Sequence, residues 1–464
     1  MDIVIILLAL FFLMFIAYRG FSVILFAPIA ALFAVLLTEP AHILPFFSGI
    51  FMEKLVGFIK LYFLVFLLGA VFGKMIEMSG FAKSITDAVV KIFGKSKVMV
   101  TVVVVGAILT YGGVSLFVVA FALYPFAAEL FKSADIPKRL IPATIALGTL
   151  TFTMDAFPGS PQIQNIIPTT FFKTDAWAAP WLGFIGCIFV FSIVLLYLDW
   201  RRRVAIKNGE GYGENHINEP ILNIDEKFPN AMIAILPLLL VGILNKVFTT
   251  MIPRYYGSTF NFINIGIKDV SPLDIPKITA VWAIEGALLV GILLVIILGF
   301  SRIKKNFNIG LNVSVGGALL ATLNTASEYG FGGVIAALPG FHSVQEGMSS
   351  VIKDPLINEA VTTTTLAGIT GSASGGMSIA LATMSEKYLA EADRLGIDHE
   401  VLHRVASMAS GGMDTLPHNG AVITLLAITG LTHKQSYIDI FVLTIFKTLT
   451  VFLVIAIYYL TGLV

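Results

Sequence analysis

The chain has 464 residues, of which 57% are hydrophobic and 13% are charged, and its formal net charge at pH 7 is +1. A soluble domain carries about 25% charged residues, so the composition excludes an ordinary soluble protein. The near-neutral charge gives no reason to expect nucleic acid as a partner, and the single cysteine, Cys187, excludes an intrachain disulfide. Runs of roughly 18 or more apolar residues recur along the chain, which is typical of an all-α, polytopic membrane protein.

The apolar runs predict membrane-spanning helices. The first run, within residues 1–20, has no basic n-region and no small-x-small cleavage site, so we expect an extra N-terminal helix rather than a signal peptide. The longest polar stretch, residues 201–229, is predicted to be a cytoplasmic linker. The predicted spans, in chain order, are residues 3–18, 21–38, 56–73, 140–171, 180–199, 230–250, 278–299, 310–338, 402–431 and 438–461.

Two further apolar segments, residues 98–131 and 357–386, carry Gly, Ser and Thr in their middles. Each is long enough to enter the membrane and return as a helical hairpin. If both do so and the N-terminus is outside, most Lys and Arg residues fall on one face, which the positive-inside rule assigns to the cytoplasm. The first hairpin then enters from the cytoplasm and the second from outside. The sequence therefore predicts two inverted repeats, residues 21–200 and 230–464.

A Met-Asp-x-x-Pro motif occurs once in each half, at Asp155 and at Asp414. Because proline removes an N–H group and clashes with the preceding turn, each motif is predicted to break its helix, residues 140–171 and 402–431. Interrupted apolar segments at corresponding positions point to the binding site of a transporter. Irregular backbone at membrane depth survives only when it is buried in protein or lines a wet cavity. We therefore expect the two breaks and the two hairpin tips to meet at an internal polar chamber.

The hairpin tips and the breaks supply the candidate substrate-binding groups. Glycines let the chain reverse and let a ligand approach the backbone. Hydroxyls, free N–H groups and half-helix N-termini can hold a carboxylate. Gly/Ser clusters can instead be close-packing sites between helices, but their occurrence in both halves favours binding. The predicted substrate-binding residues are Thr110, Tyr111, Gly112, Gly113 and Ser115 at the first tip, Ser372, Ser374 and Gly375 at the second, and Ser160, Gln162, His418 and Asn419 at the breaks.

Three acids are candidates for coupling transport to an ion. An ionisable residue in mid-membrane costs at least ~2.5 kcal/mol and is a functional candidate by default. Asp155 and Asp414 could carry the coupling charge or cap the half-helix that follows, and the two roles are compatible. Glu328, which has polar neighbours, is predicted to line the chamber or to take up the coupling proton. We find no nucleotide-binding, zinc-ligand or nucleophile-elbow motif, so we predict no enzyme activity, no cofactor and no metal.

The order of hairpin, loop and broken helix, occurring twice, resembles the gluconate permease family of bacterial secondary transporters, within the larger ion-transporter superfamily. The similarity covers essentially the whole chain, and its strongest pieces are Gly69–Lys74, Tyr111–Pro125, Ser133–Pro142 and the tip at 370–376. The resemblance implies proton-coupled uptake of a small hydroxy-monocarboxylate across the bacterial cytoplasmic (inner) membrane. It also implies an elevator, in which a scaffold that forms a homodimer in the lipid carries a transport domain made of the hairpins and broken helices.

The break loops depart from the family pattern. Gluconate-type members have a first break rich in His and Pro and a second break of the type His-x-Asn-Asp, whereas this chain has Met154–Pro161 and Met413–Asn419. A shorter, less hydroxylated substrate needs fewer polar partners, and unpaired buried polar groups are costly. Phe157 and Leu416 would fit a partly apolar ligand. We therefore expect 3-hydroxybutyrate or a similar short acid, with gluconate or a related sugar acid as the alternative.

Two other mechanisms remain open from the sequence. Sodium could replace the proton, because backbone carbonyls at helix breaks and hairpin hydroxyls can coordinate Na⁺. A passive channel is a remote alternative, because channels usually present rings of pore-lining groups from a symmetric oligomer, whereas this chain carries two inverted sites.

Overall fold

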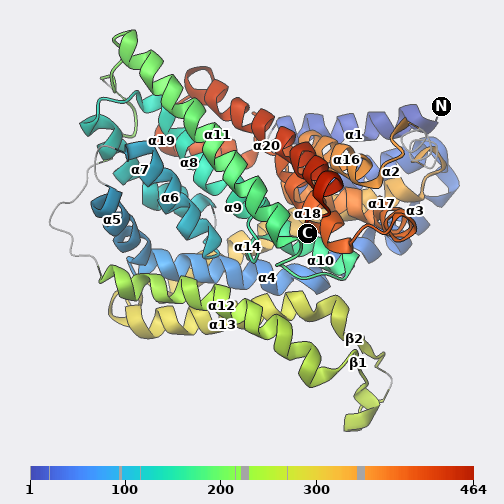
Figure 1. Cartoon of the computed structure of the whole chain (residues 1–464). Helices are drawn as coiled ribbons and strands as arrows, with labels where there is room; N and C mark the ends of the chain where they lie inside the picture. Colours follow the sequence, from blue (N-terminus) through green and yellow to red (C-terminus); the bar gives the residue numbers. More distant parts are fainter. Residues whose placement is uncertain are drawn as a thin grey trace.

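The computed structural model describes residues 2–19, 21–93, 97–114, 116–214, 216–220, 229–268, 270–341, 351–417 and 419–464. These residues are almost entirely helical (Figure 1). Within them the departure from an all-α chain is one short antiparallel pair, β1 (Thr259–Phe260) and β2 (Leu273–Asp274). The prediction of a helical, polytopic chain is confirmed at this level.

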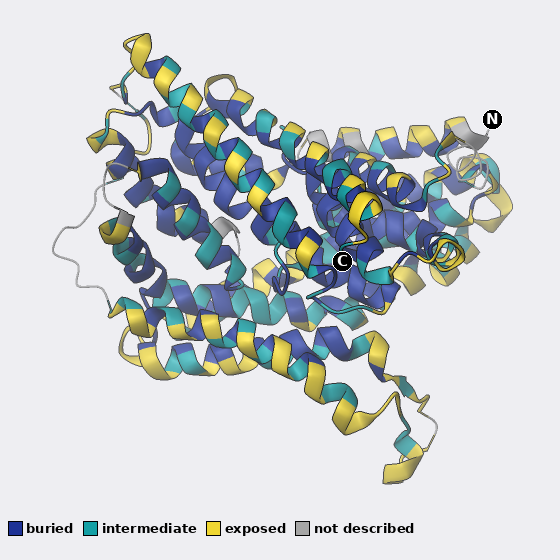
Figure 2. Ribbon diagram, in the orientation of Figure 1, coloured by how far each residue is buried: buried dark blue, intermediate teal, exposed yellow. Residues whose placement is uncertain are grey.

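Six helical segments of the described chain are long and apolar enough to cross a membrane. They are Pro40–Met78, which ends in α4 (Met52–Met78), α11 (Pro180–Lys207), α12 (Ala231–Tyr256), α13 (Ile275–Ile303), α14 (Phe307–Ala337) and α20 (His433–Thr461). Large apolar side chains such as Leu239, Ile243 and Ile297 are exposed on α12 and α13, and Figure 2 shows exposed residues along the outer faces of these helices. Such faces suit a lipid environment, because apolar side chains can contact lipid tails at no cost.

The remaining N-terminal elements are shorter. They are α1 (Asp2–Tyr18), α2 (Val23–Thr38), η1 (Pro40–His42), α3 (Ile43–Phe46), the π-helical turn η2 (Phe47–Phe51) and α5 (Phe81–Phe93), with η5 (Phe262–Ile265) beside the strands. α4 packs against α13 and α14, α12 packs against α13 and α5, and α14 also packs against α2. Figure 1 shows α4, α12 and α13 running together along one face of the molecule.

The first half contains a hairpin followed by an interrupted helix. The hairpin consists of α6 (Val98–Tyr111) and α7 (Leu116–Ser133), and its turn needs a glycine because Gly113 has φ +89°. After η4 (Lys138–Leu140), the chain forms α8 (Ile141–Thr149), α9 (Phe152–Asp155) and α10 (Ile163–Phe172). The interval between α9 and α10 holds Pro158 and Pro161, which cannot continue a helix.

The second half has the same order of elements. α16 (Pro355–Thr370) and α17 (Ala373–Leu395) form a hairpin that turns at Gly371, with φ +67°, and its arms are pressed so close that a Cβ on Gly376 would overlap the backbone of Ala367. α17 continues well beyond residue 386, because its charged last turns are helical although they are not apolar. The interrupted helix follows as α18 (His399–Gly412) and α19 (Gly420–Thr429).

The two interrupted helices lie against each other and against α20. α18 packs on α9, α10 and α20, and α8 also contacts α20. In Figure 1, α6 and α7 lie toward one end of the molecule and α16 and α17 toward the other, with α8, α9, α10 and α18 between them.

A buried carboxylate fixes the start of α20 to the first half. Asp439 is fully buried, and its oxygens accept from Arg201 at 2.6 Å, from Tyr197 at 2.8 Å and from Arg139 at 3.1 Å. Arg139 also binds Glu210 of the linker at 2.6 Å. Because a buried charge is tolerated when it is fully paired, this network joins α11, η4 and α20 into one unit.

Candidate functional site

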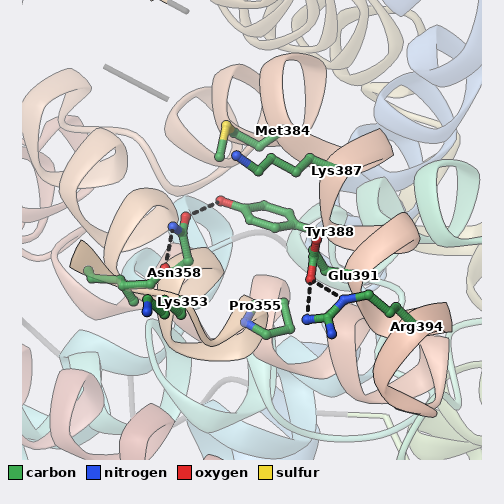
Figure 3. Close-up of a pocket in the computed structure, with 9 residues that line it drawn as sticks. Lys353, Pro355, Asn358, Met384, Lys387, Tyr388, Glu391 and Arg394 are labelled. Carbon is green, nitrogen blue, oxygen red and sulfur yellow. Dashed lines mark hydrogen bonds and ion pairs between the residues drawn. The ribbon is translucent and has the colours of Figure 1, made fainter. Parts of the chain in front are cut away.

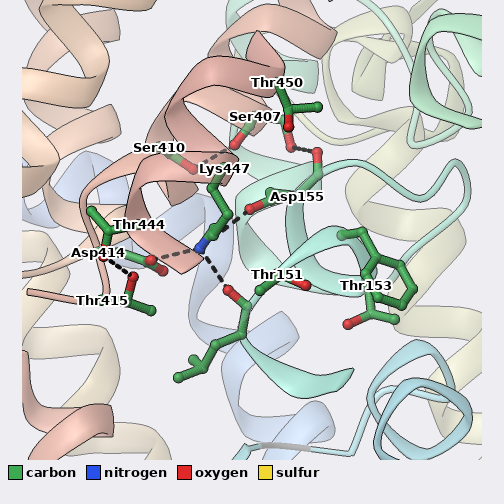
Figure 4. Close-up of polar contacts among 12 residues, drawn as sticks. Thr151, Thr153, Asp155, Ser407, Ser410, Asp414, Thr415, Thr444, Lys447 and Thr450 are labelled. Carbon is green, nitrogen blue, oxygen red and sulfur yellow. Dashed lines mark hydrogen bonds and ion pairs between the residues drawn. The ribbon is translucent and has the colours of Figure 1, made fainter. Parts of the chain in front are cut away.

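Lys447, in the middle of α20, brings the two repeated aspartates together (Figure 4). Its Nζ lies 2.7 Å from Oδ1 of Asp414 and 3.7 Å from Oδ2 of Asp155, and it donates to the carbonyl of Leu150 at 2.6 Å. Lys447 is 4% exposed and each aspartate 5%. The two motifs, far apart in the chain, thus share one buried cation.

Neither aspartate caps the half-helix that follows its break. α19 begins after Asn419, whose side chain accepts from the N–H groups of Ala421 at 2.7 Å and Val422 at 3.3 Å. α10 begins after Gln162, whereas Asp155 ends α9. Both aspartates therefore contact Lys447, and neither has the capping role that the sequence left open.

A second buried cation, Arg404 of α18, holds the backbone of the first break. Its Nη1 donates to the carbonyl of Asp155 at 3.3 Å and to Oδ1 of Asn165 at 3.0 Å, and its Nη2 donates to the carbonyl of Ala178 at 2.6 Å. Ser407 also donates to the carbonyl of Asp155, at 2.7 Å. Arg404 is fully buried and contacts Asp155 through its backbone carbonyl, whereas Lys447 forms the ion pairs with both carboxylates. The first break is therefore positioned by a helix of the second half.

The polar residues after the first break are largely engaged with one another. The hydroxyl of Ser160 donates to the carbonyl of Thr153 at 2.7 Å. The amide of Asn165 donates to the carbonyls of Ser160 at 2.9 Å and Ala176 at 2.8 Å, and His403 lies against its oxygen at 3.2 Å. Ser160, predicted as a substrate-binding residue, thus uses its hydroxyl to shape the break.

The first hairpin tip is bonded to the first break. The hydroxyl of Tyr111 donates to the carbonyl of Pro158 at 3.1 Å, and Nε2 of Gln162 donates to the carbonyl of Thr110 at 2.7 Å. The hydroxyl of Thr110 is buried without a partner in the described structure. A Cβ on Gly112 would overlap Leu238 of α12, so the tip also touches that helix closely.

The second hairpin tip is bonded to the second break in a similar way. Nδ2 of Asn419 donates to the carbonyl of Gly371 at 2.8 Å. The hydroxyl of Ser372 accepts from the N–H of Gly375 at 3.0 Å and hydrogen-bonds the carboxylate of Glu328. Ser374 lies 3.5 Å from the Ser372 hydroxyl, oxygen to oxygen. In both halves an amide side chain from the break thus binds a carbonyl at the hairpin tip.

Glu328 of α14 lies directly against the second tip. It is 3% exposed, and its Oε2 has no hydrogen-bond partner among the residues that the structure describes. A Cβ on Gly375 would overlap that same oxygen, so the glycine leaves the space that the carboxylate fills. Within the described ranges no cation forms an ion pair with Glu328, which sets it apart from Asp155 and Asp414.

A cavity of about 290 Å³ lies between α4, α10 and α14, and Tyr329, the residue after Glu328, lines it. Its lining residues are Glu53, Lys54, Gly57, Phe58, Leu61, Tyr62, Phe171 and Tyr329. Tyr62 donates to the carbonyl of Ile167 at 3.2 Å and hydrogen-bonds Thr170, which ties α4 to α10. In the described part of the chain no group of three or more His, Cys, Asp or Glu side chains could hold a metal.

Two of the predicted site residues, Ser115 and His418, lie outside the described residues. The sequence interpretation missed Lys447 and Arg404 as members of the cluster. A lone lysine within the apolar run 438–461 is a signal that could have identified the first, because a charge at membrane depth needs a partner. Arg404 gave the same signal, because it is a charged residue inside the predicted broken span 402–431.

The chain is similar to known transporters. Residues 1–265 match the GntP family permease profile. The uncharacterized transporter YxjC of Bacillus subtilis (strain 168) is 60% identical over 472 residues, which cover 100% of each chain. Among solved structures, the YdaH transporter of Alcanivorax borkumensis is 15% identical, with a TM-score of 0.49 over 90% of this chain and 88% of that chain. The match to residues 1–265 and the identity to the Bacillus protein, together with the apolar helices, confirm the family resemblance: the chain belongs to the GntP permease family, and is a multi-pass protein of the bacterial inner membrane.

Proposed function

We propose that this permease is a secondary active transporter that imports a small hydroxy-monocarboxylate, 3-hydroxybutyrate or a similar short acid, together with a proton. The observation that carries the proposal is the arrangement of the second hairpin tip. Hydroxyls of Ser372 and Ser374 and the N-terminus of α17 gather there beside Glu328, a buried carboxyl group that forms no ion pair with a described residue. Hydroxyls and a helix N-terminus suit an anionic substrate, and the carboxyl group suits a proton.

Glu328 is the group we propose for the coupling proton. An unpaired charge costs far more in a buried site than a neutral group does, so a proton bound there offsets that cost. Asp155 and Asp414 both lie within ion-pair distance of Lys447, so each already has a cationic partner. In the proposal the aspartates hold the two breaks in place, and Glu328 exchanges the proton.

The apolar groups at the tips favour a short acid over a sugar acid. The rings of Tyr111 and Phe157 lie 4.7 Å apart, centroid to centroid, so the first tip and first break meet through aromatic surface. Leu416 lies at the second break, where it faces Gly368. A methyl group packs against such surfaces without loss, whereas each hydroxyl of a sugar acid would need a polar partner.

The proposed motion is an elevator. The hairpins, the interrupted helices, α11 and α20 would form the transport domain, and α4, α12, α13 and α14 the scaffold. The packing supports this division, because α12 packs on α13, α13 on α4 and α4 on α14, while α18 packs on α9, α10 and α20. The two parts meet where α14 packs on α17. In the same proposal residues 21–200 and 230–464 are inverted repeats, and the scaffold forms a homodimer.

Uptake of labelled acids into proteoliposomes tests the proposal. With an inward proton gradient and no sodium, we expect 3-hydroxybutyrate to accumulate, unlabelled gluconate to compete poorly, and accumulation to collapse when a protonophore is added. Accumulation of gluconate instead would show that the substrate is a sugar acid rather than a short hydroxy acid. Uptake that needs sodium, and ignores the protonophore, would contradict proton coupling.

A further inference from the structure

A second buried glutamate in the same half lacks a partner. Glu359, in the second turn of α16, is fully buried, and neither of its carboxylate oxygens has a hydrogen-bond partner among the described residues. No described cation forms an ion pair with it either. A carboxyl group kept in such a place is expensive, and in a membrane protein it is a functional candidate by default.

A surface cavity is lined by Asn358, the residue that precedes Glu359 in the chain. The cavity has a volume of about 230 Å³ and lies at the base of the second hairpin (Figure 3). Tyr388 of α17 and Asn358 of α16 line it, and the hydroxyl of Tyr388 donates to Oδ1 of Asn358 at 3.2 Å. Tyr388 also lies within electrostatic reach of Glu359, so it stands between the cavity that it lines and the buried carboxyl group.

The other ionisable groups of this region do not neutralise Glu359. At the mouth of the cavity, Arg394 pairs with Glu391 at 2.7 Å, and Figure 3 shows Lys353 and Lys387 along the same lining. The helices packed against α16 carry further ionisable side chains, which include Glu386, Lys387 and Tyr388 on α17, His399, Glu400, His403 and Arg404 on α18, and Asp439, Lys447 and Tyr459 on α20. Tyr459 hydrogen-bonds Asp354, the N-cap of α16. Among these, Tyr388 is the side chain with an electrostatic link to Glu359.

The C-terminal end of α16 lies at the second hairpin tip, where we propose that the substrate binds. Thr363 lies one turn after Glu359 on the same helix face, and its hydroxyl is likewise buried without a partner in the described structure. α16 ends at Thr370, and the next residue but one, Ser372, hydrogen-bonds Glu328. At ~1.5 Å per residue, Glu359 and Thr370 are about 16 Å apart along the helix. A carboxyl group without a partner thus lies near the base of the second hairpin, and the carboxyl group of Glu328 lies against its tip.

We propose that Glu359 is a second proton-binding site, loaded from this cavity past Tyr388 and Asn358, which supplies the coupling proton to the second hairpin. On the topology predicted from the positive charges, the cavity opens to the outside. One carboxylate oxygen takes up a proton from cavity water and later releases it, and no other bond changes. The proposal rests on the proton-coupled transport proposed above, and its tests separate the two.

The first test compares Glu359→Gln with the wild type in proteoliposomes. We expect accumulation of 3-hydroxybutyrate driven by a proton gradient to fall about ten-fold, while exchange of labelled for unlabelled acid without a gradient stays within about two-fold. Glu285→Gln, which alters a partly buried glutamate of α13, is the matched control and should change neither. Undiminished proton-driven accumulation in Glu359→Gln would overturn the proposal.

The second test needs no substrate. Infrared difference spectra of the wild type against Glu359→Gln at neutral pH should contain the C=O band of one protonated carboxyl group, and identical spectra would overturn the proposal. If the wild type does not exchange labelled for unlabelled 3-hydroxybutyrate, the proposed substrate is wrong. The C=O band still shows whether Glu359 binds a proton. Should Glu359→Gln fail to fold, Tyr388→Phe replaces it. That variant should slow proton-driven uptake and spare exchange, and an unchanged rate would rule out entry past Tyr388.

Discussion

Nζ of Lys447 lies 2.7 Å from Oδ1 of Asp414, and this ion pair joins the second break to α20 where almost no water reaches. Removal of one partner from a buried ion pair typically costs 3–5 kcal/mol, because the other charge is left uncompensated, whereas replacement of both partners is often neutral. Asp155, 3.7 Å from the same nitrogen, shares the cation. Lys447 therefore stabilises the arrangement of both breaks.

Lys447→Met should destabilise the folded protein by about 3 kcal/mol, because it leaves Asp414 and Asp155 without their shared cation. The melting temperature in detergent measures the effect. The double variant Lys447→Met/Asp414→Asn should recover part of the loss, since it also removes one of the uncompensated charges. Lys434→Met, on the exposed start of the same helix, is the control. If Lys447→Met melts no lower than this control, the ion pairs do not hold the breaks.

Asp414→Asn should impair uptake more than Asp155→Asn does. Asp414 makes the direct hydrogen bond to Lys447 at 2.7 Å, whereas Asp155 lies 3.7 Å away and has Arg404 as a second source of positive charge. Uptake by equal amounts of each variant in proteoliposomes tests the order. Normal uptake by Asp414→Asn would remove that residue from the mechanism, and equal losses would mean that the two breaks depend on Lys447 alike.

The sequence predicted the elements of the site better than their contacts. The repeated Met-Asp-x-x-Pro motif and the Gly/Ser clusters locate the breaks and turns, because proline and glycine act on the local backbone. The helix α17 extends past the predicted 357–386, since an apolar pattern ends where a helix leaves the membrane and not where the helix ends. The pairing of Asp155 with Lys447 joins residues far apart in the chain, and no local pattern encodes such a pair.

The roles of individual polar residues were equally hard to foresee. Asn419 was predicted to bind substrate, and the structure shows it as the N-cap of α19 and as a donor to Gly371. Ser160 was predicted in the same way, and its hydroxyl is taken up by the carbonyl of Thr153. Short polar side chains can satisfy a break or a ligand equally well from sequence alone, because both present unpaired backbone groups.

Gly375→Ala should weaken proton-driven uptake while the protein still folds. The added methyl group would overlap Oε2 of Glu328, and the flexible carboxylate would have to move away from Ser372. Gly317→Ala is the matched control on the helix of Glu328, because a Cβ there meets nothing within 4 Å. That change should be neutral or stabilising by up to about 1 kcal/mol, since alanine favours a helix over glycine. Normal proton-driven uptake by Gly375→Ala would argue against Glu328 as the coupling group.

Asn419→Asp should separate the two roles of Asn419. The carboxylate still accepts from the N–H groups of Ala421 and Val422, so the N-cap of α19 survives and stability should change by less than about 0.5 kcal/mol. The donor to the carbonyl of Gly371 is lost and replaced by repulsion between two oxygens, so uptake should fall. Asn419→Ala removes the cap as well and should also cost about 1 kcal/mol of stability.

Gln162→Glu makes the equivalent change at the first tip, where the side-chain amide donates to the carbonyl of Thr110 at 2.7 Å. Gln162 makes no side-chain cap for α10, so this variant tests the tip contact alone. We expect a loss of uptake similar to that of Asn419→Asp, with Asn230→Asp at the N-cap of α12 as the unaffected control. Both variants are compared by initial rate of uptake and by melting temperature. If Gln162→Glu transports normally and Asn419→Asp does not, the substrate binds at the second tip, and the contact at the first tip is structural.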